Sequence, residues 1–383
     1  MMRTATLLFL LAVPAAAEDF GPATVDTRDG ALAIAVDREF RDALATGVTG
    51  DVILEQDGKV VLKAGYGWAD RAKQVPFTTR TIAQIGSLTK QFTAMALIGL
   101  WHDGKVDFAK PVKTYLPNVA EPVASVTLDQ ILTHRSGMPE YCGDDFAELS
   151  KAELLSKCAA TPLAFAPGTQ SQYSNPGYGI IAAVVEQVSG MPIDAYLKKR
   201  FFGPLGMHDT GYAFPGVPLD RFAVGYLDGK SQGIISETLK PLHGDAWNLI
   251  GNGGIQASTD DMYRWYRALS RDGGLPKDMR DMATAQHAQE EKDIAEGYGW
   301  ALRKAPDGHT VQVSHSGSDG TFFSYFCWRP DDRTFFYMVG NSGEKPATAL
   351  VKKMLVSVRD AGKMPVTSTK TPDAPPAKPP INH

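Results

Sequence analysis

Ser87 and Lys90 form an S-x-x-K pair that could support attack of a serine oxygen on a carbonyl carbon. They precede a run, residues 91–101, that is apolar on nearly all sides and therefore predicts a buried helix. Their spacing puts both side chains on one face near the helix N-terminus. The helix dipole there favours negative charge on the serine oxygen, and a desolvated lysine has a lowered pKa and can accept the serine proton.

This S-x-x-K spacing is not specific by itself. A surface serine and lysine at the mouth of a core helix would give the same pattern, and residues 342–345 repeat it. Gly343 and Pro346 make a helical turn at the second copy unfavourable. Further partners are needed to decide between the catalytic and the structural interpretation of the first copy.

Tyr173-Ser174-Asn175 offers such partners, because it follows a Pro-Gly loop signal and precedes a predicted helix at residues 179–188. A tyrosine close to a serine and a lysine can pass a proton to a leaving group, provided that nearby positive charge stabilises its phenolate. The side-chain amide of Asn175 can orient either Lys90 or a substrate amide. Taken alone, Tyr173 is more typical of a capped turn.

A third motif, His315-Ser316-Gly317-Ser318, lies at the end of a predicted strand, residues 310–313. Its glycine allows a substrate backbone to approach the strand edge, and the next backbone N–H can point into an oxyanion hole. A strand end followed by an ordinary glycine turn is at least as common for such a tetrapeptide in isolation.

The three motifs lie in a chain that predicts strands at both ends and helices between them. Residues 51–69 predict a hairpin with its turn at Asp57-Gly58. Further strands are predicted at residues 297–302, 310–313, 322–328 and 335–339, and helices at residues 152–159, 179–188 and 262–270. We therefore expect an α+β fold, in which an antiparallel sheet built from both chain ends holds an inserted helical lobe at roughly residues 100–290.

The two ends of the sequence fall outside this pattern. Residues 1–17 carry Arg3, a short apolar stretch and small residues before a cleavage point after Ala17, which is the layout of a secretory signal peptide. The stretch is shorter than the about 20 residues that span a membrane, so we expect a secreted or periplasmic mature protein without a membrane span. Residues 364–383 hold six prolines and no periodic apolar pattern, which predicts a disordered tail. The residues between the two ends, 18–363, are predicted to form one domain.

Together, the three motifs resemble the serine β-lactamase and penicillin-binding-protein superfamily, in which S-x-x-K is the first signature. With Tyr-x-Asn in second place, the chain is similar to class C β-lactamases and their relatives, which include esterases, D-aminopeptidases and D-Ala-D-Ala carboxypeptidases. The motifs stand in the family's order, and the resemblance spans about residues 40–341. Similar flanking segments lie at residues 132–137, 165–168, 204–207 and 253–254.

The resemblance implies a β-lactamase/transpeptidase-like fold and a two-step acyl transfer that needs no metal and no organic cofactor. Ser87 would be acylated, Lys90 would be its general base or proton relay, and Tyr173 would be the second acid or base. The implied substrate-binding and oxyanion residues are Asn175, His315, Ser316, Gly317 and Ser318.

Within that last set, the resemblance implies particular tasks. The amide of Asn175 would orient the substrate, and the backbone N–H groups of Ser87 and Ser318 would form the oxyanion hole. The segment His315-Ser316-Gly317 would line the cleft.

One departure from the family pattern bears on the substrate. Class C β-lactamases normally carry lysine where this chain has His315, and histidine, with an ordinary pKa of about 6.5, is mostly neutral at pH 7. This favours an exported serine hydrolase of small esters or D-amino-acid amides and peptides. The alternatives are a class C-type β-lactamase or D-Ala-D-Ala carboxypeptidase and, outside enzymes, a lapsed peptidoglycan-ligand binder or sensor on the same fold.

The charge balance and the cysteines bear on the partners that the chain could bind and on its redox state. A net charge of −4, from 39 basic and 43 acidic residues, gives no electrostatic attraction to nucleic acid. The resemblance implies a small ester, a β-lactam or a short D-amino-acid peptide as partner. Cys142 and Cys158 could pair in an oxidising compartment, whereas Cys327 lies in an aromatic run and is predicted to be a small buried hydrophobe. The histidines and cysteines lack metal-ligand spacings.

Overall fold

The fold is described from a computed structural model that covers residues 19–143, 148–234, 246–271 and 274–361. The predicted signal peptide at residues 1–17 and the predicted tail at residues 364–383 lie outside the described residues, so both stay predictions.

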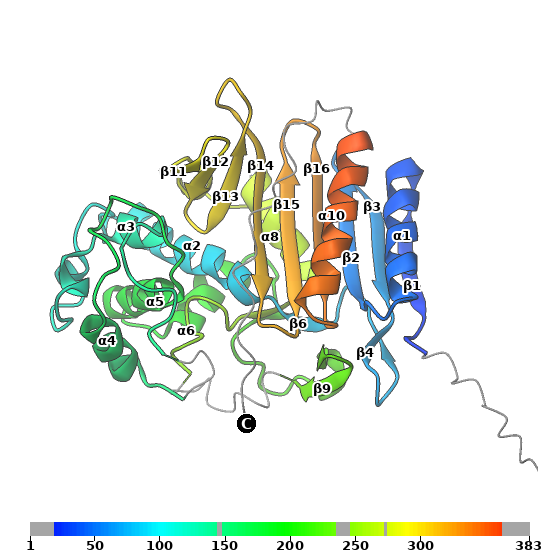
Figure 1. The fold of residues 1–383 in the computed structure, drawn as a ribbon, viewed down its shortest axis with the longest axis horizontal. Coiled ribbons are helices and arrows are strands. Elements are labelled where there is room, and N and C mark those ends of the chain that lie inside the picture. Colours follow the sequence, from blue (N-terminus) through cyan, green and yellow to red (C-terminus); the bar gives the residue numbers. More distant parts are fainter. Residues whose placement is uncertain (1–18, 144–147, 235–245, 272–273, 362–383) are drawn as a thin grey trace, which may run out of the picture.

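A large antiparallel sheet forms the centre of the described molecule and uses strands from both chain ends (Figure 1). The N-terminal and C-terminal strands meet where β2 pairs with β16, for example at Val52 opposite Met338. The sheet thus confirms the predicted α+β fold. In sheet order the strands are β1 (Ala23–Arg28), β3 (Lys59–Tyr66), β2 (Gly50–Gln56), β16 (Thr334–Gly340), β15 (Phe323–Arg329), β14 (Thr310–Ser318), β13 (Trp300–Lys304), β12 (Ile294–Gly297) and β11 (Ala288–Glu291).

The turns of the sheet confirm one local prediction and correct another. Asp57 and Gly58 both have positive φ, 52° and 82°, as a two-residue hairpin turn between β2 and β3 requires. The strand predicted at residues 297–302 is wrong, because Gly299 (φ 80°) turns the chain between β12 and β13. This turn packs so tightly on α2 (Thr89–His102) that a Cβ at Gly299 would lie 2.9 Å from the Cα of Gln91.

Helices cover both faces of the sheet. On one face α1 (Gly30–Leu44) and α10 (Glu344–Ala361) pack together over side chains such as Leu54 and Met338 (Figure 1). The expectation of no helical turn around residues 342–345 is wrong, since α10 starts at Glu344. Pro346 is tolerated because the first turn of a helix has no intrahelical partner for its N–H groups.

The other face of the sheet is covered by α8 (Thr259–Ser270), which is attached through the buried carboxylate of Glu55 in β2. Glu55 accepts hydrogen bonds from the hydroxyl groups of Tyr263 (2.6 Å) and Tyr266 (3.1 Å) and from the guanidinium of Arg271 (2.7 Å). A buried carboxylate with this many donors is satisfied, and it fixes the helix against the sheet.

The helical lobe lies to one side of the sheet, and α2 runs from the sheet into its middle (Figure 1). Residues 89–100 of α2 are all buried, which confirms the predicted core helix. The remaining helices of the lobe are α3 (Leu128–Leu132), α4 (Lys151–Ala160), α5 (Asn175–Ser189), α6 (Ile193–Leu197), its π-helical continuation Lys198–Phe202, and α9 (Lys277–Thr284).

Short strands connect the lobe to the sheet. Strand β6 delivers the chain to the start of α2 and pairs with β10, which also pairs with β7. The short strands are β4 (Trp68–Asp70), β5 (Val75–Pro76), β6 (Ile82–Gln84), β7 (Thr210–Gly211), β8 (Gly225–Leu227), β9 (Lys230–Gly233) and β10 (Gln256–Ser258).

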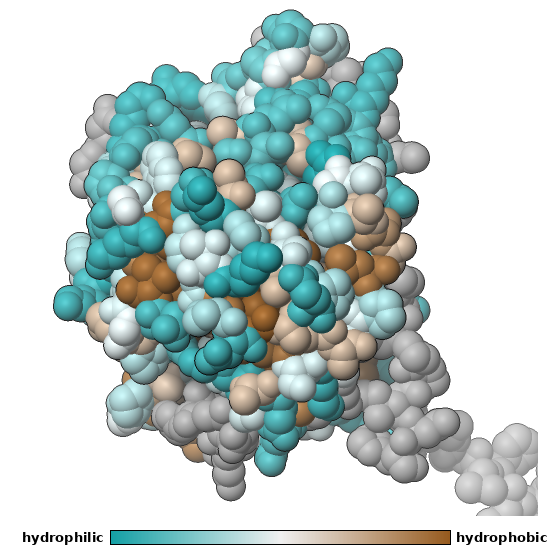
Figure 2. All heavy atoms as spheres, turned by 90° about the vertical axis from the view of Figure 1, so that its left-hand side faces the viewer, coloured by the Kyte–Doolittle hydropathy of each residue, from teal (hydrophilic) through white to brown (hydrophobic). Residues whose placement is uncertain are grey.

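The surface on the lobe side is mostly hydrophilic, with small apolar areas separated by polar side chains (Figure 2). Within the part of the chain that the structure describes, no single helix is both long and apolar enough to cross a bilayer; only α5 and the segment Ile193–Phe202, taken together across a 71° bend, reach that length and composition.

Candidate active site

Ser87 lies where the sheet meets the helical lobe. The chain leaves β6, forms a short 3-10 helix at Gly86–Leu88 and continues directly into α2. Because α2 begins at Thr89, Ser87 precedes the helix rather than belonging to it, but the two helical segments are continuous. Lys90, in the first turn of α2, therefore still faces Ser87, and their Nζ and Oγ atoms are 3.2 Å apart.

Lys90 is completely buried, and three oxygens from three segments surround its Nζ. They are Oγ of Ser87 (3.2 Å), Oδ1 of Asn175 (2.7 Å) and the backbone carbonyl of Asn252 (3.0 Å). The amide and carbonyl oxygens only accept hydrogen bonds, whereas the serine hydroxyl can accept or donate. A neutral Lys90 can therefore donate to Asn175 and Asn252 while its lone pair accepts the Ser87 proton, which is the arrangement a general base needs.

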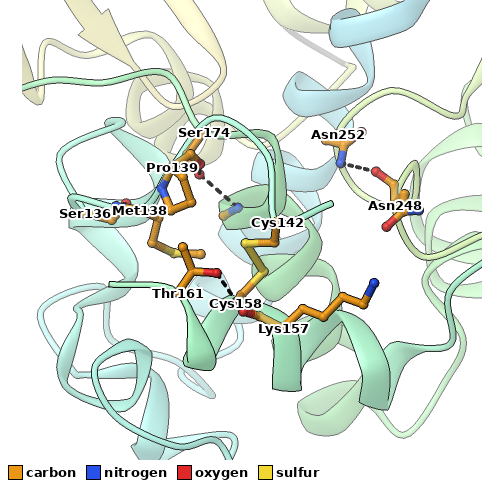
Figure 3. Close-up of a disulfide and its surroundings, with 11 residues drawn as sticks. Ser136, Met138, Pro139, Cys142, Lys157, Cys158, Thr161, Ser174, Asn248 and Asn252 are labelled. Carbon is orange, nitrogen blue, oxygen red and sulfur yellow. Dashed lines mark hydrogen bonds between the residues drawn. A yellow bond between two sulfur atoms is a disulfide. The ribbon is translucent and has the colours of Figure 1, made fainter. Parts of the chain in front are cut away.

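The Asn252 carbonyl is a part of the site that the sequence motifs did not reveal; only the neighbouring Gly253-Gly254 pair was noted, as a family likeness. The loop that carries it is held by buried side chains. Asn252 donates from Nδ2 to the carbonyl of Asn248 (2.6 Å; Figure 3), and Gln84 and Thr93 donate to the carbonyls of Gly253 (2.8 Å) and Gly251 (2.7 Å). These bonds keep the Asn252 carbonyl aimed at Lys90.

Tyr173 adjoins both residues, as predicted. Its ring centroid is 4.6 Å from Nζ of Lys90, and its hydroxyl is hydrogen-bonded to Ser87. Burial nevertheless raises the pKa of Tyr173 well above its usual value, and the Ser87 bond offsets only part of that rise. The expected stabilisation of the phenolate by nearby positive charge is therefore outweighed, and Tyr173 stands in the free protein as a neutral phenol that can donate a proton.

The candidate oxyanion donors are two backbone N–H groups, and they are positioned by two segments of the backbone that nearly touch. Gly86 has φ +53°, and a Cβ there would lie 2.5 Å from the backbone nitrogen of Ser318. A Cβ at Gly317 would lie 1.9 Å from the carbonyl oxygen of Ile85 and 2.9 Å from the backbone nitrogen of Ser87. The two glycines thus bring the Ser87 and Ser318 N–H groups to one place, where they can stabilise the same developing oxyanion.

Ser316 is the one residue of the predicted cleft wall whose side chain lies elsewhere. Residues 313–318 of β14 pair with β15 in continuous register, so side chains alternate between the two sheet faces. The hydroxyl of Ser318 donates to Glu344 of α10 (2.7 Å), so Ser316, two residues away, also faces the α10 side. Gly317 and His315 face the site, and Ser316 contributes only its backbone.

His315 is kept neutral by its surroundings. Its Nδ1 donates to the carbonyl of Ser316 (2.6 Å), which leaves Nε2 as an acceptor. Burial, and next the charge of Lys90, lower the pKa of His315 to about 4. Between about pH 4 and its ordinary pKa of about 6.5, the folded chain therefore holds this ring uncharged where the unfolded chain protonates it, and this contribution to stability is lost as the pH falls through that window.

Tyr141, Glu296 and Glu140 act with burial to raise the pKa of Tyr173. Burial also raises the pKa of Glu296 well above its usual value, which favours the uncharged form of that carboxyl group. His134 is also close, but burial, followed by Lys90 and His315, holds its pKa well below the usual value. Of the three basic side chains in this group, the two histidines are thus uncharged at neutral pH.

The cysteines occupy the places expected for them. Cys142 and Cys158 form a disulfide that joins the loop before residue 143 to α4 (Figure 3). Cys327 is fully buried in β15, and burial raises the pKa of its thiol to about 12, so it is an unreactive part of the core. Among the described residues, no group of three or more His, Cys, Asp or Glu side chains could hold a metal ion.

Sequence inspection overlooked one further serine pattern, G-x-S-x-G at residues 229–233. The structure places it in the exposed hairpin of β8 and β9. A nucleophile elbow requires a strand-to-helix turn at the top of a sheet, so Ser231 has neither the position nor the partners of a nucleophile.

A serine beside a buried lysine at the start of a buried helix, between an antiparallel sheet and a helical lobe, is the arrangement that acyl transfer through a serine requires. The β-lactamase family profile matches residues 36–359 of this sequence, and the chain therefore belongs to the β-lactamase family. Both statements agree with the resemblance found in the motifs.

Relatives named for several different activities are similar in sequence to this chain. The chain is 28% identical to esterase EstB of Burkholderia gladioli over 75% of its own length and 82% of that protein. It is 29% identical to a D-aminopeptidase of Brucella anthropi (71% and 52%) and 28% identical to a penicillin-binding protein of Bacillus subtilis strain 168 (70% and 62%). The chain spans 62% and 55% of the length of two B. subtilis penicillin-binding relatives.

Solved structures agree with the fold. The penicillin-binding protein of Bacillus halodurans superposes with a TM-score of 0.72 at 24% identity, over 85% of this chain and 98% of that one. At this identity the likeness establishes the fold alone.

The contact between β14 and the Ser87 turn gives a direct test. Gly317→Ala would force a methyl group against the Ile85 carbonyl, which separates the two N–H donors. We expect kcat for a short-chain p-nitrophenyl ester to fall at least about 100-fold, since small displacements of oxyanion donors cost that much. The matched control is Ser316→Ala, whose side chain is on the other sheet face and which should stay within about twofold of wild type. Equal losses in the two variants would contradict the geometry.

Proposed function

We propose that this protein hydrolyses small esters or D-amino-acid amides through an acyl-enzyme on Ser87. The observation that carries the proposal is the arrangement around Lys90, in which a buried amine touches two obligate acceptors and the hydroxyl of Ser87. The same amine lies against the ring of a protonated Tyr173. One group can therefore take the serine proton and another can give a proton to the leaving group.

In the first step, Oγ of Ser87 attacks the substrate carbonyl carbon while Lys90 takes the hydroxyl proton. The carbonyl oxygen becomes an oxyanion between the N–H groups of Ser87 and Ser318. As the bond to the leaving oxygen or nitrogen breaks, Tyr173 gives that atom a proton, and the proton that Lys90 took from Ser87 then passes to Tyr173. The alcohol or amine leaves, and the net change is an acyl group in place of the serine proton.

In the second step, water attacks the acyl carbon. Lys90 accepts a proton from that water, and the Ser87 oxygen leaves and takes the proton back. The acid is released and the enzyme returns to its starting protonation state. Because burial opposes a phenolate at Tyr173, Lys90 is the stronger candidate for the base in both steps.

The electrostatics of the site support uncharged substrates. A neutral His315 offers no fixed positive charge to a substrate carboxylate, and Glu140 acts to raise the pKa of Tyr173 rather than to lower it. Penicillins, cephalosporins and D-Ala-D-Ala peptides all carry a carboxylate close to the scissile bond. We therefore place β-lactamase or carboxypeptidase action second, and the high coverage of the esterase relative supports this order.

Ser87→Ala should abolish labelling by a fluorophosphonate probe and lower ester turnover at least about a thousandfold, because no other group supplies the nucleophile. Labelling is read by gel fluorescence and turnover by p-nitrophenol release. Ser231→Ala, in the exposed G-x-S-x-G hairpin, is the matched control and should label like wild type. Persistent labelling of Ser87→Ala would refute the nucleophile assignment. A stoichiometric burst of wild type without steady turnover would indicate a binder instead.

The wild type should turn over short-chain esters with higher kcat/KM than a chromogenic cephalosporin. Restoring a cation with His315→Lys should raise kcat/KM for the cephalosporin about tenfold, in line with one charge-assisted hydrogen bond to its carboxylate. His315→Gln, which keeps the site neutral, should leave that preference unchanged. Since the pKa of His315 is lowered to about 4, the ester profile of His315→Gln should match wild type in shape between pH 5 and 8. A wild type that prefers the cephalosporin would reverse our ranking.

We also propose that the protein is exported. The N-terminal pattern that predicts a signal peptide supports this, and so does the Cys142–Cys158 disulfide, since such bonds persist in oxidising compartments. Mass spectrometry of protein from the medium or periplasm of an expressing bacterium should find Glu18 as the first residue. It should also recover both cysteines in one linked peptide without reductant. An intact N-terminus in the cytosolic fraction would count against export.

A further inference from the structure

His134 contacts the Tyr173 segment at three points. This residue follows α3 and has a positive φ of 55°, which turns its carbonyl toward the chain before α5. That carbonyl accepts the N–H of Gln172 (2.8 Å), and Nδ1 of the ring accepts the N–H of Ser174 (3.1 Å). The ring itself lies on Tyr173, with centroids 4.4 Å apart and planes tilted by 35°.

We propose that His134 is a positioning residue for Tyr173, acting as a neutral imidazole that fixes the backbone on both sides of the tyrosine and the direction of its ring. This inference rests on the proposed function in so far as Tyr173 transfers the proton. His134 itself touches neither Ser87 nor the reacting atoms in the contacts described above, so its effect on the reaction would pass through the tyrosine.

The contacts of His134 explain how a single residue can fix the side chain of Tyr173. With the N–H groups of residues 172 and 174 both tied to His134, the Cα–Cβ direction of Tyr173 is fixed. The remaining freedom is ring rotation about the side-chain bonds, and the imidazole on the ring limits it. Lys90 also contacts this ring, at 4.6 Å. The hydroxyl is thereby held at Ser87.

His134 is itself held rigidly, because its segment is bonded along its length to the chain that leads to α5. Arg135 accepts from the N–H of Gly168 (2.8 Å), Pro139 accepts from the hydroxyl of Ser174 (2.8 Å; Figure 3), and Glu140 accepts from the N–H of Asn175 (3.1 Å). The Cys142–Cys158 disulfide closes the far end of this segment. A side chain on such a support can impose its position on its neighbour.

The protonation state is consistent with this role. The titratable groups around the ring are Lys90, His315 and the phenols of Tyr173 and Tyr178. Burial and the two basic groups keep His134 uncharged, so Nδ1 stays available as an acceptor for Ser174. A proton on Nδ1 would place two N–H groups against each other.

The test separates the acceptor from mere filling of space. In His134→Asn, Oδ1 occupies the same bond position as Nδ1, and asparagine tolerates positive φ. In His134→Leu, the space is filled but the acceptor is lost. We expect kcat for a p-nitrophenyl ester to stay within about threefold of wild type in the asparagine variant. It should fall about 10- to 100-fold in the leucine variant, with KM changed less than about twofold. Equal losses in both would overturn the proposal.

A double-mutant cycle with Tyr173→Phe shows whether the effect passes through the tyrosine. If it does, His134→Leu combined with Tyr173→Phe should be no slower than Tyr173→Phe alone, within about threefold. Multiplicative losses would refute a positioning role even if His134→Leu is slow. If Tyr173→Phe alone has wild-type kcat, the role of Tyr173 in the proposed function fails, which is a different result. Labelling of Ser87 by the fluorophosphonate probe reports whether each variant is folded. If His134→Leu is not labelled, His134→Ala takes its place in the experiment.

Discussion

The buried amine of Lys90 joins the segments that form the candidate site. The amine of a lysine without solvent must have hydrogen-bond partners, or it destabilises the fold by several kcal/mol. Here the partners come from the turn before α2, from the start of α5 and from the loop at Asn252. Satisfying the lysine therefore brings three distant segments together. Because one partner is the hydroxyl of Ser87, the same requirement places Ser87 beside Lys90.

A second constraint joins this lobe to the sheet. The turn at Gly86 and the end of β14 at Gly317 approach so closely that neither position has room for a Cβ. The hydroxyl of Ser324 in β15 donates to the carbonyl of Ile85 (2.8 Å) and holds the turn in place. The sheet thus carries one candidate oxyanion donor, the N–H of Ser318, and the start of the helix carries the other, the N–H of Ser87. A sheet assembled from both chain ends is what allows β14 and β15 to reach a residue some 230 positions earlier in the chain.

The charge pattern of the site follows from burial around that single lysine. Desolvation and the neighbouring amine keep His134 and His315 neutral, and desolvation keeps Tyr173 protonated. Each neutral group is then free to act as an acceptor or a proton donor rather than as a fixed charge. This arrangement is consistent with the acyl transfer on uncharged substrates that we propose. It also leaves His134 as a neutral residue that can hold Tyr173 in place.

Local sequence patterns predict the proposed chemistry and most of the elements that carry it. They sufficed for Ser87 and Lys90 on an apolar helix, for Tyr173 and Asn175 ahead of α5, and for the hairpin at residues 57–58, because spacing, apolar periodicity and turn chemistry act over a few residues. Long-range packing, by contrast, places the Asn252 carbonyl and sets the direction of the Ser316 side chain, the turn at Gly299 and the pKa shifts. Backbone carbonyls leave no motif, and strand faces, close approaches and desolvation are set by what packs opposite a residue from far along the chain.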